Sequence, residues 1–231
     1  WRFPSDIADF GVAEINENSA NPLNLFYRIE RARQQGKIQI FTMAFRDIRK
    51  NRLTYSMMYA CGSHAILPWD VYITSDSPRL FIPPEEFADL SGFVRAMAPF
   101  LDDYSTDSVA GIVFDEFSES SLCVSENETL CVLARRPKKG NCVIHLVEWG
   151  NDAQKTQLKL NPQKYWNKNR PTEVILWTPL PYEPSIHKNA EQSGDYSRLA
   201  RSEIISVRYN ADDTAIIDLP HINCWGIITV P

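Results

Sequence analysis

The first part of the chain alternates short apolar runs with segments of helical periodicity. Residues 10–15 form an apolar run that ends beside a carboxylate, and residues 38–45 form a longer, almost continuously apolar run. A third run covers residues 65–72. Continuous apolar runs of this kind are typical of parallel strands that are buried on both faces. We therefore predict three parallel strands.

Helical segments follow each of these runs. Asn21 and Pro22 predict an N-cap and a first helical turn, because proline is tolerated where its missing N–H costs no hydrogen bond. Apolar positions then repeat at helical spacing until Gly36, which predicts the helix end. The same spacing predicts helices over residues 52–61 and 84–101. Strands and helices that alternate with short links indicate parallel β/α architecture.

The pattern changes after residue 104, where strand-like stretches recur without helices between them. Turn-forming Gly, Asn and Asp residues separate them. The predicted strands are residues 130–135, 143–149, 156–160, 173–177, 203–209, 214–219 and 225–230. They predict an antiparallel β-sandwich, and the polar segment 183–201 is predicted to be a long loop. We expect one domain over residues 1–104 and a β-sandwich domain over residues 105–231.

Composition narrows the classes of function. The 231 residues suffice for one large or two modest domains, and 44% apolar with 23% charged residues is ordinary for a globular protein. A net charge of −5 without a basic patch argues against a nucleic-acid partner. No stretch approaches the roughly 20 apolar residues of a membrane span, so no membrane partner is expected.

Cysteine and histidine spacing suggests no metal site, and no glycine-rich phosphate loop is present, so we expect no metal and no cofactor. Four of the five cysteines follow residue 120, where they are either paired in a secreted β-domain or isolated buried thiols. The chain opens on Trp1 rather than Met. We expect it to be part of a longer polypeptide.

Several stretches resemble the closing part of glycoside hydrolases with a (β/α)8 barrel. The segment SHAILPWDVY at residues 63–72 resembles the eighth barrel strand, and LFIPPEEFADL at 80–90 resembles the loop and final helix. The segments VIHLVEW at 143–149 and NCWGIITV at 223–230 are similar to strands of the C-terminal sandwiches of these enzymes. The resemblance implies the last three β/α units of a TIM barrel followed by an accessory sandwich. It also implies a poly- or oligosaccharide substrate and an N-terminal barrel portion outside this sequence.

Enzymes with such barrels place functional groups at the C-terminal ends of the strands. At those ends lie Glu14, Arg46, Asp47, Trp69, Asp70 and Tyr72. Glycoside cleavage uses two carboxylates, and we expect Glu14 and Asp70 to be catalytic. The other four are expected to bind the sugar: Trp69 by stacking, and Arg46 by holding an acidic group or by orienting Asp70.

Four of the six candidates also have a structural interpretation. Glu14 suits a rim ion pair or a helix cap, Asp47 suits a loop cap, and Trp69 suits barrel packing. Asp70 suits a buried pair with Arg46.

Two other functions stay open on the sequence. One is a non-catalytic carbohydrate-binding or assembly module that presents Trp149, Trp166, Trp177 or Tyr182. The other is a complete small α+β protein unrelated to sugars. For the hydrolase we expect a secreted or periplasmic location.

Overall fold

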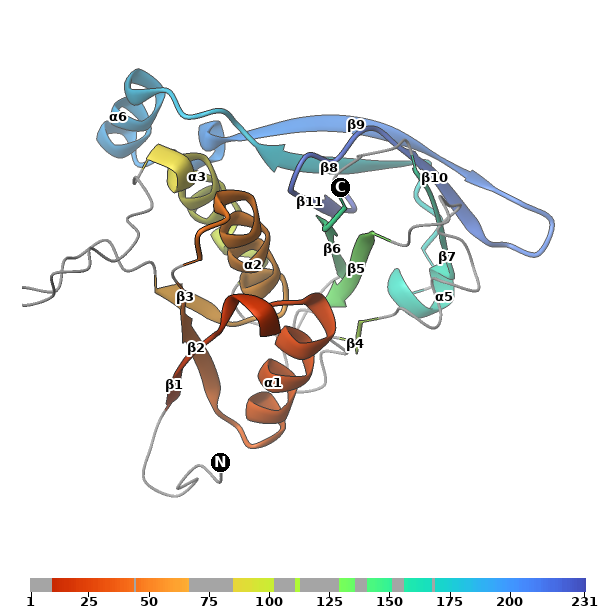
Figure 1. Ribbon diagram of the computed structural model, residues 1–231. Coiled ribbons are helices and arrows are strands. Elements are labelled where there is room, and N and C mark those ends of the chain that lie inside the picture. Colours follow the sequence, from red (N-terminus) through yellow and green to blue (C-terminus); the bar gives the residue numbers. More distant parts are fainter. Residues whose placement is uncertain are drawn as a thin grey trace, which may run out of the picture.

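The computed structural model describes residues 10–43, 45–66, 85–101, 111–112, 129–135, 141–150, 156–167 and 169–231. Within these residues the chain forms a parallel sheet of three strands and an antiparallel sheet of eight. Helices α2 (Ile48–Ala60) and α3 (Glu85–Leu101) lie between the two sheets (Figure 1). The predicted combination of an α/β part and an all-β part is therefore present.

The parallel sheet has the order expected of consecutive β/α units. Its elements are β1 (Phe10–Glu14), η1 (Glu17–Ser19), α1 (Pro22–Gln34), β2 (Ile38–Thr42) and β3 (His64–Ile66). The strands lie in the order β1-β2-β3, and helices α1 and α2 pack against each other. Right-handed crossovers between strands in consecutive order bring both helices to the same face. The sheet is thus wound in one direction, with helices on one side.

The two faces of this sheet differ in their surroundings. Gln39 and Phe41 point to the helix side and are buried. The alternate positions point to the other side, where four apolar side chains remain largely exposed: Phe10, Val12, Ile38 and Ile66. The strand register places Phe10 beside Ile38 and therefore on the same face. Among the residues that the structure describes, this apolar face of the sheet is therefore largely uncovered.

Both helices that follow a parallel strand end in the same way. Gly36 and Gly62 adopt positive φ angles of 67° and 82°. The amide of Gly62 donates to the carbonyl of Tyr59 at 3.0 Å, and that of Ser63 donates to the carbonyl of Met58 at 2.9 Å. This pair of bonds is a Schellman motif, which favours glycine at the left-handed position. The equivalent pair of bonds closes α1 at Gly36.

Two element boundaries in the parallel part differ from the prediction by more than one residue. Strand β2 ends at Thr42 instead of residue 45, and α2 begins at Ile48 instead of residue 52. Both differences arise because Asp47 caps α2 and Asn51 binds the backbone of the preceding loop. The predicted third strand is described over His64–Ile66 only, and residues 67–72 lie outside the described residues.

The predicted sandwich is a single curled antiparallel sheet. Its strands are β4 (Gly111–Ile112), β5 (Leu130–Arg135), β6 (Val143–Glu148), β7 (Thr156–Leu160), β8 (Glu173–Pro179), β9 (Ala200–Tyr209), β10 (Ala215–Leu219) and β11 (Trp225–Thr229). They lie in the order β4-β5-β6-β11-β8-β9-β10-β7. The long strand β9 pairs with β8 on one side and with β10 on the other (Figure 1). The two halves of the sheet therefore enclose one core without forming two separate sheets.

The segment predicted to be a long loop contains two helical elements. They are α6 (Pro184–Ser193) and η2 (Tyr196–Leu199), and a further short helix α5 (Pro162–Tyr165) follows β7. Element η2 packs on α3, and Ala190 of α6 is buried. The loop prediction was wrong because this segment is polar and has few apolar anchors: Ala190 is the buried residue of α6 and Leu199 that of η2.

Strands β5 and β6 are buried at every position. Alternate side chains enter two different cores. Val132 and Ile144 face the interior of the curled sheet, whereas Leu133 and Val147 pack with the residues of α2 and α3. One hydrophobic core therefore joins the parallel and antiparallel parts of the protein.

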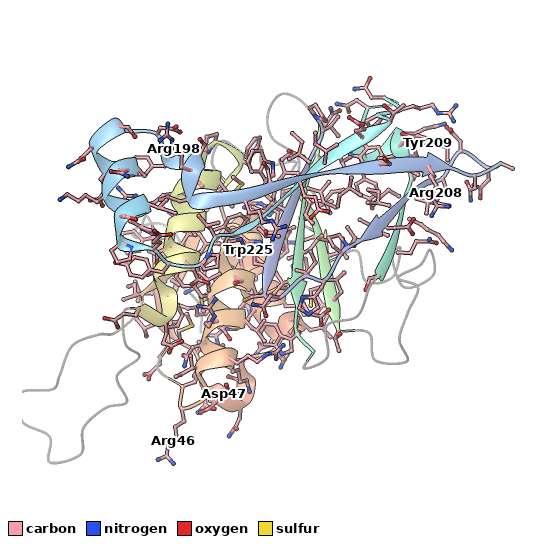
Figure 2. All side chains as sticks on the ribbon, turned by 90° about the horizontal axis from the view of Figure 1, so that it is seen from above. Arg46, Asp47, Arg198, Arg208, Tyr209 and Trp225 are labelled. Carbon is pink, nitrogen blue, oxygen red and sulfur yellow. The ribbon has the colours of Figure 1, made fainter. Side chains whose placement is uncertain are left out.

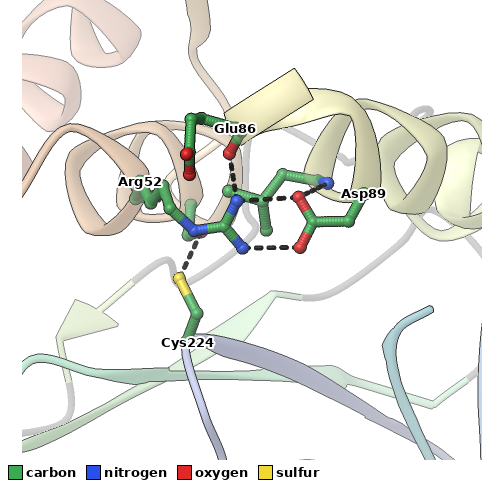
Figure 3. A network of polar contacts seen from close by, with 6 residues as sticks. Arg52, Glu86, Asp89 and Cys224 are labelled. Atoms are coloured by element: carbon green, nitrogen blue, oxygen red, sulfur yellow. Dashed lines mark hydrogen bonds and ion pairs between the residues drawn. The ribbon is translucent and has the colours of Figure 1, made fainter. Parts of the chain in front are cut away.

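One face of α2 also makes polar contacts with the antiparallel sheet. This face carries Arg49, Arg52, Ser56 and Tyr59, which recur at helical spacing. Arg49 donates to the backbone carbonyl of Gly150, and the hydroxyl of Ser56 lies 3.4 Å from Sγ of Cys224. Figure 3 shows Arg52 between the two helices, beside Cys224. Its guanidinium binds Asp89 of α3 in a bidentate pair at 2.8 and 2.5 Å.

Candidate functional site

Glu14 is the last residue of β1 and lies on the face without helices. It pairs in register with Thr42, which pairs in turn with Ile66. These three residues form one layer across the C-terminal ends of the parallel strands, where the parallel units leave their βα loops. The side chain of Glu14 is exposed. An accessible carboxylate at this edge is able to exchange a proton, to act as a nucleophile or to bind a polar ligand.

The loop after β2 is held by Asn51, a fully buried residue of α2. Its Oδ1 accepts from the amide of Phe45 at 3.0 Å. Its Nδ2 donates to the carbonyls of Phe45 and Asp47 at 2.8 and 2.9 Å. The loop is thus fixed at both ends by one amide group, and the side chain of Arg46 between them points away from the protein (Figure 2).

Two carboxylates organise the same edge. Oδ1 of Asp47 accepts from the amide of Lys50 at 3.1 Å, which caps the first turn of α2. Oε2 of Glu17 accepts from the backbone amide of Arg46 at 3.3 Å and so connects the loops that follow β1 and β2. Asp47 therefore acts as the N-cap of α2, in agreement with its structural interpretation. The hydrogen bond to Glu17 fixes the loops after β1 and β2 relative to each other.

The structure places three of the six candidates at one edge of the parallel sheet: Glu14, Arg46 and Asp47. Trp69, Asp70 and Tyr72 lie outside the described residues. Sequence reasoning missed Asn51 as the residue that holds the loop. The available signal was an amide side chain one turn after the helix N-cap.

The aromatic residues named for a binding module differ in accessibility. Trp166 is completely buried in the core of the curled sheet. Trp177 is partly buried and its indole N–H donates to Oγ1 of Thr229 at 2.9 Å. Tyr182 is 43% exposed and packs against the ring of His187. Trp166 therefore has no face available for stacking on a sugar.

Over the described ranges, no group of three or more His, Cys, Asp and Glu side chains is arranged to hold a metal ion. The cysteines placed there, at positions 61, 131, 142 and 224, are buried free thiols. Burial raises the pKa of Cys61 to about 12, which keeps this thiol protonated. None of the helices in the described part combines the length and apolar character needed to cross a membrane.

Comparison with known proteins yields solved structures of distant likeness. No family model matches the chain, and no curated protein matches it. A cycloisomaltooligosaccharide glucanotransferase from Paenibacillus sp., solved with cycloisomaltoheptaose, aligns with 79% of this chain at a TM-score of 0.45 and 14% sequence identity. The chain spans 27% of the length of that enzyme. A likeness at this level transfers neither reaction nor substrate.

Proposed function

We propose that the chain is the closing part of a (β/α)8-barrel glycoside hydrolase that acts on a poly- or oligosaccharide outside the cytoplasm. The curled antiparallel sheet would be its accessory domain. The observation that carries the proposal is the uncovered apolar face of the parallel sheet, with the accessible carboxylate of Glu14 at its C-terminal end.

The winding of the sheet supports a barrel over an open doubly wound sheet. An open sheet of the doubly wound type reverses its strand order and places helices on both faces. Here the order is consecutive and helices α1 and α2 share one face. Parallel strands normally bury both faces, and a barrel does so by closing the sheet on itself. The exposed side chains of Phe10, Val12 and Ile38 would then face the barrel interior.

This arrangement implies a partner for the parallel sheet. In the described residues β1 and β3 are the two ends of the sheet, each paired on one side only. Further parallel strands, supplied by the N-terminal barrel portion, would pair with these edges and cover the apolar face. The active site would then be shared between that portion and this chain.

The proposed chemistry uses two carboxylates at the barrel rim. Glu14 and Asp70 would serve as acid, base or nucleophile at the glycosidic bond, through an oxocarbenium-like transition state. Arg46, on its clamped loop, would hold a polar or acidic group of the sugar. Trp69 would stack on a sugar ring, and Asp47 and Tyr72 would contribute hydrogen bonds.

The test is carried out on the complete protein that contains this chain. Release of reducing ends from neutral and acidic polysaccharides identifies a substrate. The variants Glu14→Gln and Asp70→Asn are then compared with Glu173→Gln, which changes an exposed carboxylate on β8 in the other sheet. We expect each rim variant to lose more than tenfold in kcat/KM, more than ~1.4 kcal/mol of barrier, with the control unchanged. Equal rates in all three variants would overturn the site assignment.

The non-catalytic alternative predicts a different outcome in the same experiment. A carbohydrate-binding module retains a polysaccharide in affinity electrophoresis and releases no reducing ends from it. The exposed ring of Tyr182 is then the residue to change, because Trp166 is buried. Loss of retention in Tyr182→Ala, without hydrolysis by the parent protein, would favour that function.

A further inference from the structure

His145 lies at the centre of the junction between the helices and the antiparallel sheet. It belongs to β6 and is completely buried. The register places Leu133 of β5 and Ile227 of β11 on either side of it, and all three point to the side of α2 and α3. Neither ring nitrogen of His145 has a hydrogen-bond partner in the part of the chain that the structure describes.

Trp225 lies next to His145, and its indole N–H likewise has no hydrogen-bond partner among the described residues. The two rings are stacked, with centroids 6.1 Å apart and planes inclined by 22°. Tyr59 of α2 and Phe93 of α3 also pack on Trp225, at centroid distances of 6.3 and 4.9 Å. Trp225 is completely buried, and its Nε1 makes no hydrogen bond to the described residues. One enclosed place thus contains three unpaired polar atoms on two adjacent side chains.

Such a concentration of unpaired polar atoms requires a physical explanation. Most buried polar groups in proteins are hydrogen-bonded, and an unpaired one is costly. Internal waters typically serve groups of this kind, with about three hydrogen bonds each. The chemistry of the two rings is complementary for a water. Indole N–H only donates, whereas a neutral imidazole has one donor and one acceptor nitrogen.

The charge state of His145 allows one of its ring nitrogens to accept a hydrogen bond from a water. Complete burial, and then the nearby positive charge of Arg135, lower the pKa of His145 well below its ordinary value. His145 is therefore neutral at physiological pH and keeps one nitrogen as an acceptor. A fully protonated ring would have two donors and could not accept a bond from a water.

We propose that an internal water molecule bridges Nε1 of Trp225 and a ring nitrogen of His145 at the junction of α2, β6 and β11. The water accepts from the indole N–H and donates to the unprotonated nitrogen of the imidazole. Its third hydrogen-bonding position serves the neighbouring protein backbone or hydroxyl groups. This inference concerns the cohesion of the fold and is independent of the proposed hydrolase activity.

A crystal structure at atomic resolution tests the proposal directly. We expect a solvent peak at about 2.7–3.2 Å from both Trp225 Nε1 and a His145 nitrogen, and we expect Trp225→Phe to lose it. A direct bond from either ring to a protein group, or a site without a peak, overturns the proposal.

The bridge can also be tested in solution on the wild-type protein, so the test does not depend on a variant that folds. In 15N-labelled wild-type protein, the indole proton of Trp225 should show a direct cross-relaxation peak to a long-lived water, with rotating-frame spectra separating it from chemical exchange. His145→Phe should weaken this peak while Trp225 stays buried. An indole proton that shows no such peak in the wild-type protein would refute the bridge.

Discussion

Gly62 offers the sharpest test of how the two parts of the protein are joined. Replacing it by alanine adds a Cβ atom at a residue with φ of 82°, 2.8 Å from Cζ of Arg135. The guanidinium of Arg135 donates to the carbonyl of Tyr59 at 3.3 Å, and so binds the C-terminal end of α2 from β5. A cation at this position also interacts favourably with the negative end of the helix dipole.

The chain contains a matched control for this change. Gly36 occupies the equivalent Schellman position at the end of α1, with φ of 67°, and a Cβ added there meets no atom within 4 Å. Gly36→Ala therefore measures the backbone cost alone, about 1–2 kcal/mol for an L-residue in the left-handed region. Gly62→Ala includes the same cost and also displaces a guanidinium.

The additional cost depends on whether Arg135 is able to move. Its side chain is long, but the residue is only 7% exposed, so the guanidinium has no free route to solvent. Losing a charge-assisted hydrogen bond in a buried place costs about 1.5–3 kcal/mol. We therefore expect Gly62→Ala to lower the free energy of unfolding by about 2.5–5 kcal/mol in total.

Urea unfolding of the two variants and of the wild type gives both values. A third variant, Gly62→Ala in an Arg135→Met background, should show only the backbone cost relative to Arg135→Met. Equal destabilisation by Gly36→Ala and Gly62→Ala would show that Arg135 gives way without cost. The reasoning about the junction would then be refuted.

The remaining predictions concern other contacts of α2 and its loop. The pKa of His145 is lower in the folded protein than the value of about 6.5 in the unfolded chain, so the free energy of unfolding should fall as the pH drops below about 6.5, by up to ~1.4 kcal/mol per pH unit. Urea titrations at several pH values should show this slope. In His145→Phe the contribution of His145 to the slope should be absent. Arg52→Met should cost about 1–3 kcal/mol by breaking the partly buried pair with Asp89, and the double variant with Asp89→Asn should cost less than the sum of the single changes in the same assay. Asn51→Leu should destabilise by about 2–4 kcal/mol by freeing the buried amide of Phe45, and hydrogen exchange should become faster at that amide, whereas unchanged protection would contradict the clamp.

The sequence predicted the regular elements better than their associations. Apolar runs and helix caps located the parallel strands and α1, because apolar side chains on both faces of a strand and the Asn21 cap leave a local signal in the sequence. The end of β2 was misplaced because Asn51, six residues after Phe45, binds the backbone that would otherwise continue the strand. A local pattern contains no record of that contact.

The join between the two parts was also not predictable. Strands β5 and β6 have apolar residues at almost every position, which is unusual for an antiparallel strand with one face in solvent. The cause is the contact of their second face with α2 and α3. For the candidate site, the sequence placed Glu14 and Arg46 at the C-terminal ends of consecutive strands. The hydrogen bond from the Arg46 amide to Glu17 could not be predicted, because it forms between two different loops.

The two-sided burial of β5 and β6 has a consequence for protein engineering. An antiparallel sheet that forms one part of a fold is a natural unit to exchange between proteins. Here the outer face of the sheet also packs against α2 and α3. A graft made at residue 129 would therefore leave Leu133 and Val147 without the helix residues that cover them. A transplantable unit would have to begin upstream of α2 and carry both helices with it. Homologous shuffling inside this chain should accordingly recover functional crossovers before Ile48 far more often than between α3 and β5.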